Sequence, residues 1–166
     1  MTSNSPQIVI TGVVSGIGKE TAQLLSSQGY HVIGVDRAPV EDFAGTFILG
    51  DLSDPTGVNQ IADKIRETAP AGIHGLANIA GVPGTAPTEV VLNINVFGVR
   101  DLIQAVRPQL QRGSSIVNLA SAVAYQWRAH KAQLAEFALA ADRQQAMTQA
   151  LADGHIVGHS YLFSKQ

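Results

Sequence analysis

The sequence predicts an α/β protein with a doubly wound parallel sheet in a three-layer α/β/α arrangement. Short apolar segments alternate with segments of helical spacing along most of the chain. The apolar segments carry few polar residues, which is typical of strands covered on both faces. The first of them runs directly into a glycine-rich loop that opens a helix. Charged residues make up only 14% of the 166 residues, so several faces are expected to be buried.

Five short apolar runs are predicted to be strands. The first is β-branched and is followed at once by glycine, which indicates a strand that ends in a tight turn. The five predicted strands are 7–11, 30–35, 46–49, 73–78 and 115–119. Right-handed crossovers between them place the connecting helices on alternate sides of the sheet. In a sheet of this kind, ligands bind at the carboxyl ends of the strands.

Helices are predicted between the strands from apolar spacing and from their start and stop residues. A helix over 16–28 ends at Gly29, and Pro55 suits the first turn of the next helix. Pro108 is expected to break a long helical stretch near its end. The later predictions are a helix over 55–68, a helical stretch over 88–111, one or two amphipathic helices over 130–153 and a turn over 154–159.

Composition excludes several classes of function. Eleven Lys and Arg against 13 Asp and Glu give a net charge of −2, which argues against nucleic-acid binding. The chain has no cysteine, so a disulfide framework and a thiolate metal site are excluded. His155 and His159 lack a third ligand nearby, and no metal site is expected. Without a secretory signal or a long apolar run, a cytoplasmic protein that does not bind membranes is predicted.

The loop after the first strand has the chemistry of a phosphate cradle. Gly12 permits the tight turn, Gly16 lets a pyrophosphate approach the backbone, and Gly18 lets the helix pack against the strand. The helix N-terminus adds free N–H groups and a partial positive charge. Ser15 and Ile17 lie between these glycines and are expected to contact the same ligand. We therefore predict that a nucleotide binds here.

Asp36, at the end of the second strand, suggests which dinucleotide binds. A carboxylate at that position accepts hydrogen bonds from the hydroxyls of an adenosine ribose and repels a 2′-phosphate. The neighbouring Arg37 could meet such a phosphate. The sequence favours NAD(H) over NADP(H), and the alternative is an aspartate that only begins a loop.

The motifs together resemble the short-chain dehydrogenase/reductase family. The resemblance covers nearly all of residues 7–165, and it implies a Rossmann fold with NAD(H)-dependent oxidoreductase activity. Its motifs are Thr11-Gly-x-x-x-Gly-Ile-Gly18, Asp51-Leu52, Asn78-Ile-Ala80-Gly81, an Asn-x-x-Gly motif at Asn95, a fifth-strand motif ending in Ser121, and Tyr161-x-x-x-Lys165. Ile79 stands where the family has a second asparagine.

The resemblance implies a catalytic set of Asn95, Ser121, Tyr161 and Lys165. Tyr161 and Lys165 are four residues apart and share one face of a helix, so the ammonium can stabilise a phenolate. Tyr161 is then the general acid or base that interconverts a secondary alcohol and a ketone. By resemblance, Lys165 also binds the nicotinamide ribose and Ser121 binds the substrate oxygen. Asn95 holds a helix distortion and a water molecule, while Asp51, Leu52, Asn78, Ala80 and Gly81 contact the cofactor.

The spacing between Ser121 and Tyr161 departs from most of the family. Forty residues separate them, and the excess is a helical insertion at about 128–157. A similar insertion marks the branch that resembles bacterial 3α-hydroxysteroid dehydrogenase/carbonyl reductase. In that branch it blocks the usual tetramer contact, so a homodimer is favoured over a tetramer. A steroid or another alicyclic substrate is the corresponding expectation.

The second departure is the end of the sequence, one residue after Lys165. Family members continue through further strands and a substrate loop. We expect a single domain over 1–166 that is part of a longer polypeptide or a truncated product. A terminal catalytic turn would be marginal and the fifth strand would have an open edge, so weak cofactor binding and poor turnover are expected of the chain alone.

Two other functions remain open from the sequence. A truncated, non-catalytic nucleotide-binding or interaction module is favoured by the early end of the chain. A methyltransferase also places an acidic residue after its second strand to bind an adenosine ribose. It does not account for Ser121, Tyr161 and Lys165 together.

Overall fold

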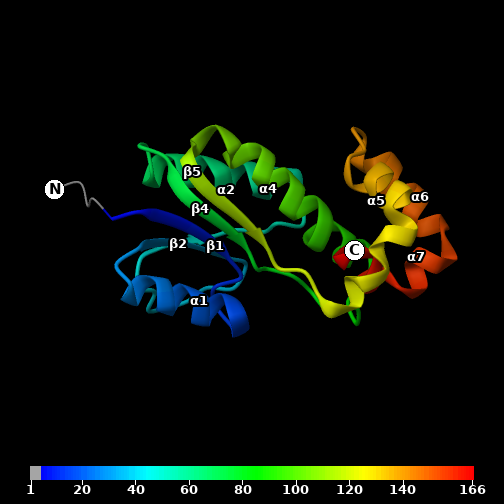
Figure 1. Cartoon of the computed structure of the whole chain (residues 1–166), viewed down its shortest axis with the longest axis horizontal. Coiled ribbons are helices and arrows are strands. Elements are labelled where there is room, and N and C mark those ends of the chain that lie inside the picture. The colour runs from blue at the N-terminus through cyan, green and yellow to red at the C-terminus, as the bar shows by residue number, and fades with distance from the viewer. Residues whose placement is uncertain (1–4) are drawn as a thin grey trace.

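The computed structural model describes residues 5–166 and contains one parallel sheet in the order β3-β2-β1-β4-β5. This is the doubly wound α/β arrangement that the sequence predicted (Figure 1). The order reverses at β1, so that β2 and β4 flank it on either side. The strands are β1 (Gln7–Thr11), β2 (His31–Asp36), β3 (Thr46–Leu49), β4 (Ile73–Asn78) and β5 (Leu110–Asn118).

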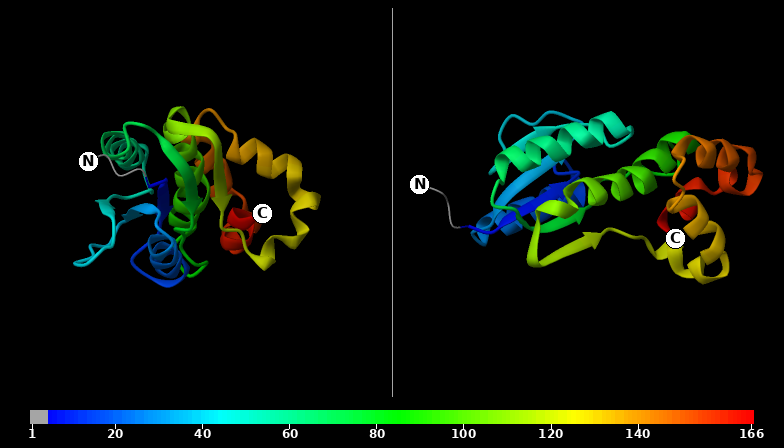
Figure 2. Two further views of the ribbon diagram at one scale, coloured as in Figure 1. Left: turned by 60° about the vertical axis from the view of Figure 1, so that its left-hand side comes forward. Right: turned by 90° about the horizontal axis from the view of Figure 1, so that it is seen from above.

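Helices cover both faces of the sheet. Helix α1 (Gly16–Ser27) lies on one face, and α2 (Pro55–Thr68) lies beside α4 (Val99–Val106) on the other (Figures 1 and 2). The cluster under α2 and α4 includes the fully buried Ile61 and Leu102. The pattern of apolar residues therefore assigns each helix to its face, as a three-layer fold requires.

The long helical stretch predicted over 88–111 is divided into four parts. It begins as α3 (Thr88–Leu92), continues as the π-helical segment η1 (Asn93–Gly98), and resumes as α4. A 3₁₀ turn, η2 (Arg107–Gln109), ends it at the predicted proline. The π-helical segment contains Asn95, where the family resemblance implied a distortion.

Strand β5 begins five residues earlier than the sequence indicated. We expected it over 115–119, but Leu110 already pairs with Ile73. The register then shifts, so that Ser115 pairs with Gly75. Gly113 lies in the shifted part at φ +88°, a conformation that glycine adopts easily. The polar run before Ser115 resembles a turn in sequence and is accommodated here as an irregularity within a strand.

The predicted insertion forms helices beyond the carboxyl ends of the strands (Figure 1). A 3₁₀ segment, η3 (Ala122–His130), leads into α5 (Lys131–Ala138), α6 (Arg143–Ala152) and α7 (Gly154–Gly158), and we call α5–α7 the insertion helices. The turn predicted over 154–159 was wrong, because α7 occupies most of it. The carboxylate of Asp153 accepts hydrogen bonds from the His155 and Ile156 amides and caps α7.

Three aromatic rings connect the insertion helices to the rest of the fold. The ring of Phe97 in η1 lies 4.8 Å from that of Phe137 in α5. Phe137 lies 5.3 Å from Phe163 in α8 (Ser160–Lys165). All three side chains are buried. Together they fix the short helix α8 against η1 and α5. Within residues 5–166, no helix is both long enough and apolar enough to cross a bilayer.

Candidate active site

The three glycines of the first loop have three different environments. Gly12 has φ +78°, and a Cβ placed there would lie 2.9 Å from the Ala80 backbone. A Cβ on Gly18 would collide with the Gly12 carbonyl. Gly16 has φ +54° and no heavy atom within 4 Å of the position of a Cβ. Two glycines are therefore required by packing, while Gly16 faces open space that a ligand can use.

Thr11 joins the ends of β1 and β4 beneath this loop. Its side chain is 1% exposed, and its Oγ1 accepts hydrogen bonds from the amides of Ile79 and Ala80, both at 3.0 Å. The loop after β4 is thereby held against the glycine loop. No local pattern in the sequence indicates this contact of the Thr11 hydroxyl, because its partners are almost 70 residues away.

Replacing Thr11 with valine is expected to destabilise the protein. The change leaves two partly buried N–H groups without an acceptor, which costs about 1–3 kcal/mol of unfolding free energy. Thr11→Ser keeps the hydroxyl and loses one methyl group, worth about 0.8 kcal/mol. Urea denaturation of both variants measures the difference. Equal stability of the valine and serine variants would show that the two hydrogen bonds contribute little.

Asp36 has a second role that the sequence did not reveal. Its Oδ2 accepts a hydrogen bond from the Val14 amide, and its Oδ1 accepts one from the Ala38 amide, both at 3.0 Å. The carboxylate therefore holds the glycine loop to the end of β2. Each carboxylate oxygen has a further lone pair, so the group can still accept from a ligand.

Ten of the predicted cofactor residues line one cavity of about 320 Å³, which we call the strand-end cavity. They are Gly12, Ser15, Ile17, Gly18, Asp36, Arg37, Asp51, Leu52, Ala80 and Gly81. The cavity lies at the carboxyl ends of β1, β2 and β4, where the strand order reverses. Gly16 is not part of its wall. Asn78 is 3% exposed, and its Nδ2 donates to Asn118 Oδ1 at 2.8 Å.

Asn95 forms a clamp between η1, the loop after β4 and α8. Its Oδ1 accepts from the Val82 amide at 2.9 Å, and its Nδ2 donates to the Val82 carbonyl at 3.1 Å. The same Nδ2 also donates to Ser164 Oγ at 3.0 Å. Asn95 is 8% exposed, so this network is shielded from water. Ser164 and Val82 were not predicted as site residues.

Tyr161 and Lys165 lie on one face of α8, as their spacing requires. Lys165 Nζ is 5.8 Å from the centroid of the Tyr161 ring, and it donates to the Leu119 carbonyl at 3.1 Å. Leu119 also lines the strand-end cavity. A Cβ on Gly81 would lie 3.5 Å from Lys165 Nζ and 3.2 Å from Asn95 Oδ1. The loop after β4 thus brings Asn95 and Lys165 together.

The structure divides the predicted residues between two adjoining cavities. Asn78, Asn95 and Lys165 line a second cavity of about 420 Å³, which shares Ala80 and Leu119 with the first. Tyr161 and Ser121 line neither of them. Ser121 is half-buried before η3, and η3 packs against α8, which carries Tyr161.

An arginine pair at the base of the insertion helices was missed by the sequence analysis. Arg143 and Arg100 both bind Asp101, at 3.0 Å and 2.7 Å, and both lie over the Phe97 ring. Burial lowers the pKa of the Arg143 guanidinium, and the Asp101 carboxylate opposes this shift. Arg143 follows Asp142 in a segment otherwise free of charge from Phe137 to Ala152, which is the one signal that could have identified it.

No metal centre is apparent in this region. The ring of His130 lies 6.1 Å from that of His155, which in turn lies 4.9 Å from His159. Across residues 5–166, no group of three or more His, Cys, Asp or Glu side chains is arranged to hold a metal ion.

The parallel sheet, the glycine loop and the strand-end cavity define a Rossmann-type α/β fold. The family model for short chain dehydrogenases matches residues 6–135. The chain belongs to this family. That match ends before Tyr161, and the catalytic pair stays a prediction from the Tyr-x-x-x-Lys motif.

Two curated relatives and one solved structure show how far the likeness extends. The chain is 46% identical over 129 residues to a coniferyl-alcohol dehydrogenase of Pseudomonas sp. (strain HR199 / DSM 7063), covering 78% of this chain and 49% of that protein. It is 32% identical over 107 residues to a 3-alpha-hydroxysteroid dehydrogenase/carbonyl reductase of Comamonas testosteroni, covering 64% and 39%. The chain thus spans about half or less of the length of these relatives.

The solved structure is the 3-alpha-hydroxysteroid dehydrogenase of Pseudomonas sp. B-0831 complexed with NADH. It superposes with a TM-score of 0.79 at 31% identity, covering 96% of this chain and 61% of that one. Because the superposition covers 96% of this chain, it includes the insertion helices. The predicted resemblance to the hydroxysteroid dehydrogenase branch is confirmed.

Proposed function

We propose that the chain binds NAD(H) in the strand-end cavity and contributes the catalytic residues of an alcohol dehydrogenase. The observation that carries this proposal is the convergence of ten predicted cofactor residues on that one cavity. The residues suit a dinucleotide, because Gly16 leaves open space beside the first turn of α1 and its free amides. Asp36 keeps lone pairs available for ribose hydroxyls.

The catalytic roles follow from the side chains around α8. When bound, the nicotinamide supplies the two-electron acceptor or donor for an alcohol and its carbonyl product. Tyr161 removes the proton from the alcohol oxygen or returns it to the carbonyl oxygen. The ammonium of Lys165, on the same face of α8, favours the phenolate that this transfer forms. Ser121 binds the substrate oxygen, and Asn95 positions α8 through Ser164.

The names of the relatives support a substrate class. One relative is named for coniferyl alcohol, and the others are named for hydroxysteroids. Both names denote alcohols that carry a ring system. We therefore propose a ring-bearing alcohol or its carbonyl counterpart, and keep the secondary alcohol of a steroid or other alicyclic compound as the first to test. A homodimer and a cytoplasmic location remain predictions.

The cofactor proposal is tested by titrating the protein with NADH and NADPH. We expect the wild type to bind NADH more tightly. Asp36→Ala should shift the ratio of the two dissociation constants toward NADPH by about tenfold or more, because unit charges about 4 Å apart near a surface interact by several kcal/mol. Nicotinamide fluorescence measures both constants.

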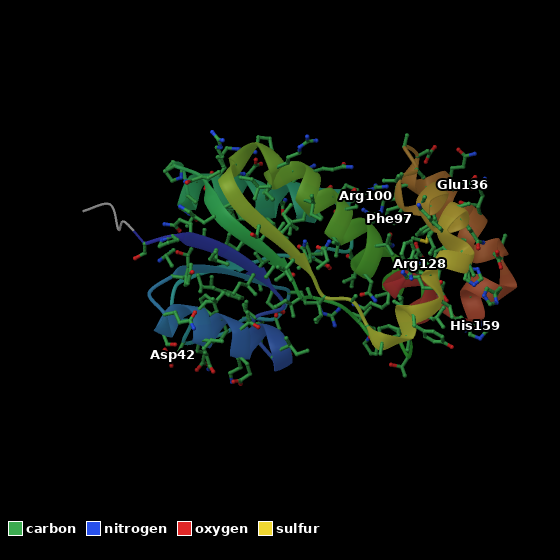
Figure 3. The ribbon with its side chains drawn as sticks, viewed as in Figure 1. Asp42, Phe97, Arg100, Arg128, Glu136 and His159 are labelled. Atoms are coloured by element: carbon green, nitrogen blue, oxygen red, sulfur yellow. The ribbon has the colours of Figure 1, made fainter. Side chains whose placement is uncertain are left out.

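The exposed Asp42, on the loop before β3, provides the control (Figure 3). Asp42→Ala removes the same charge and does not alter the strand-end cavity, so the ratio should stay at the wild-type value. A wild type that binds neither dinucleotide would favour the non-catalytic interaction module. An unchanged ratio in Asp36→Ala would refute the role of this carboxylate.

A further inference from the structure

The guanidinium of Arg143 connects the insertion helices to two other parts of the fold. The catalytic proposal gives this connection no role. Its Nη2 donates to the Ser53 carbonyl at 2.6 Å and to Asn93 Oδ1 at 2.8 Å. Its Nε also reaches Asn93 Oδ1, at 3.2 Å, while its Nη1 binds Asp101. The Arg143 side chain is only 15% exposed. Such a set of charged hydrogen bonds holds its partners in one geometry.

Ser53 closes the loop that forms one wall of the strand-end cavity. Asp51 and Leu52 line the cavity directly before it. The Ser53 amide donates to Asp51 Oδ1 at 2.8 Å, so the loop folds back on itself. A Cβ on Gly98 would lie 2.6 Å from the Leu52 carbonyl, which shows how closely the loop packs on η1. Arg143 adds the attachment at the end of this loop.

Asn93 is the first residue of η1, two residues before Asn95. By binding both Asn93 and Ser53, Arg143 fixes the cavity wall to the segment that carries Asn95. Asp101 in α4, which Arg143 shares with Arg100, offsets part of its charge. A residue of the insertion therefore sets the distance between two parts of the site that lie about 40 residues apart in the chain.

We propose that Arg143 is a positioning residue for the cofactor, holding the Asp51–Ser53 loop in the shape that receives the adenine half of the dinucleotide. The adenine half is expected here because the Gly50 amide, directly before this loop, donates to the carbonyl of Asp36 at 2.9 Å, and Asp36 is the proposed partner of the adenosine ribose. This inference depends on the proposed NAD(H) site. It gives the insertion a role in cofactor affinity, in addition to covering the core.

Arg100 offers a matched control because it shares most of the surroundings of Arg143. It binds the same Asp101 and lies over the same Phe97 ring, at the junction of η1 and α4 with the insertion helices (Figure 3). Its remaining hydrogen bonds go to the carbonyls of Ala138 and Ala140, within the insertion. Arg100 lines the second cavity but not the strand-end cavity, so Arg100→Lys should disturb the packing while the Asp51–Ser53 loop stays attached to Arg143.

The experiment compares Arg143→Lys with Arg100→Lys. Lysine keeps the charge beside Asp101 but cannot reproduce the planar fork that reaches Ser53 and Asn93. We expect the dissociation constant of NADH to rise about five- to tenfold in Arg143→Lys, the factor that results if the released loop takes its binding shape about 10–20% of the time. It should stay within about twofold of wild type in Arg100→Lys. ADP-ribose lacks the nicotinamide, and the affinity of the protein for it should fall by the same factor as the affinity for NADH.

A second measurement needs no cofactor. Hydrogen exchange of the Ser53 amide should be faster in Arg143→Lys alone, because the loop is released there. Equal effects of the two variants on binding, or no effect of either, would overturn the inference. If the wild type binds no dinucleotide, the proposed function fails, and faster exchange confined to Arg143→Lys would still support the attachment of the loop. Asn93→Ala, which removes one acceptor of Arg143, should reproduce the exchange change if Arg143→Lys does not fold.

Discussion

Replacing Gly16 with alanine is expected to weaken NADH binding tenfold to a hundredfold while the protein stays folded. The position has φ +54° and no atom within 4 Å of a Cβ, so the added methyl group meets no protein atom. A left-handed alanine costs about 1–2 kcal/mol, which a folded domain of this size tolerates. The methyl group instead takes space beside the α1 amides. Losing one charged hydrogen bond to the pyrophosphate, about 1.5–3 kcal/mol, gives the expected change.

Gly113 separates the loss of binding from the backbone strain. It has φ +88°, and no heavy atom lies within 4 Å of the position of a Cβ. It lies in β5, outside the strand-end cavity. Gly113→Ala should lower the unfolding free energy by a similar amount and leave NADH affinity unchanged. Isothermal titration and urea denaturation of both variants measure the two quantities. If Gly16→Ala binds NADH as tightly as the wild type, the pyrophosphate does not bind at this position.

The fold could be predicted because its elements are defined by local signals. The apolar runs of β1, β3 and β4, and the proline that begins α2, determine their bounds without reference to the rest of the chain. One error occurs where a distant contact decides. The early part of β5 is polar, and it forms a strand because Leu110 pairs with Ile73 of β4. Helix α7 was missed for a different reason: its cap, Asp153, is a local signal in a glycine- and histidine-rich segment, and only the burial of Ile156 depends on distant residues.

The candidate site shows the same division between local and distant information. The sequence motifs identified Asp36, Asn95 and Lys165 as individual site residues. They did not indicate that Asp36 holds the Val14 amide or that Asn95 binds Val82 and Ser164. Those partners lie on segments that are distant in the sequence and come together only in the folded protein. Arg143 belongs to no motif, and its importance follows from burial beside Ser53 and Asn93, which no spacing in the sequence encodes.

Replacing Tyr161 with phenylalanine should abolish most of the turnover and leave NADH binding almost unchanged. The substitution removes only the hydroxyl that exchanges a proton with the substrate oxygen. General acid–base catalysis contributes about 10²–10⁴-fold to a rate, so kcat should fall by that factor. The ring stays packed beside Gly84, and Lys165 keeps its hydrogen bond to the Leu119 carbonyl. Formation of the reduced nicotinamide from a ring-bearing alcohol measures turnover, and fluorescence titration measures binding.

Tyr125 provides the control, because Tyr125→Phe removes a tyrosine hydroxyl that has no proposed catalytic role. It lies in η3 with 73% of its surface exposed, and its hydroxyl accepts a hydrogen bond from Gln126. Tyr125→Phe should leave both kcat and NADH affinity at the wild-type values. Tyr161→Phe with full turnover would show that another group moves the proton. A parallel loss of binding and turnover would instead show that the Tyr161 hydroxyl holds the cofactor. Only an isolated loss of kcat agrees with the general acid–base role, because that role begins after both ligands are bound.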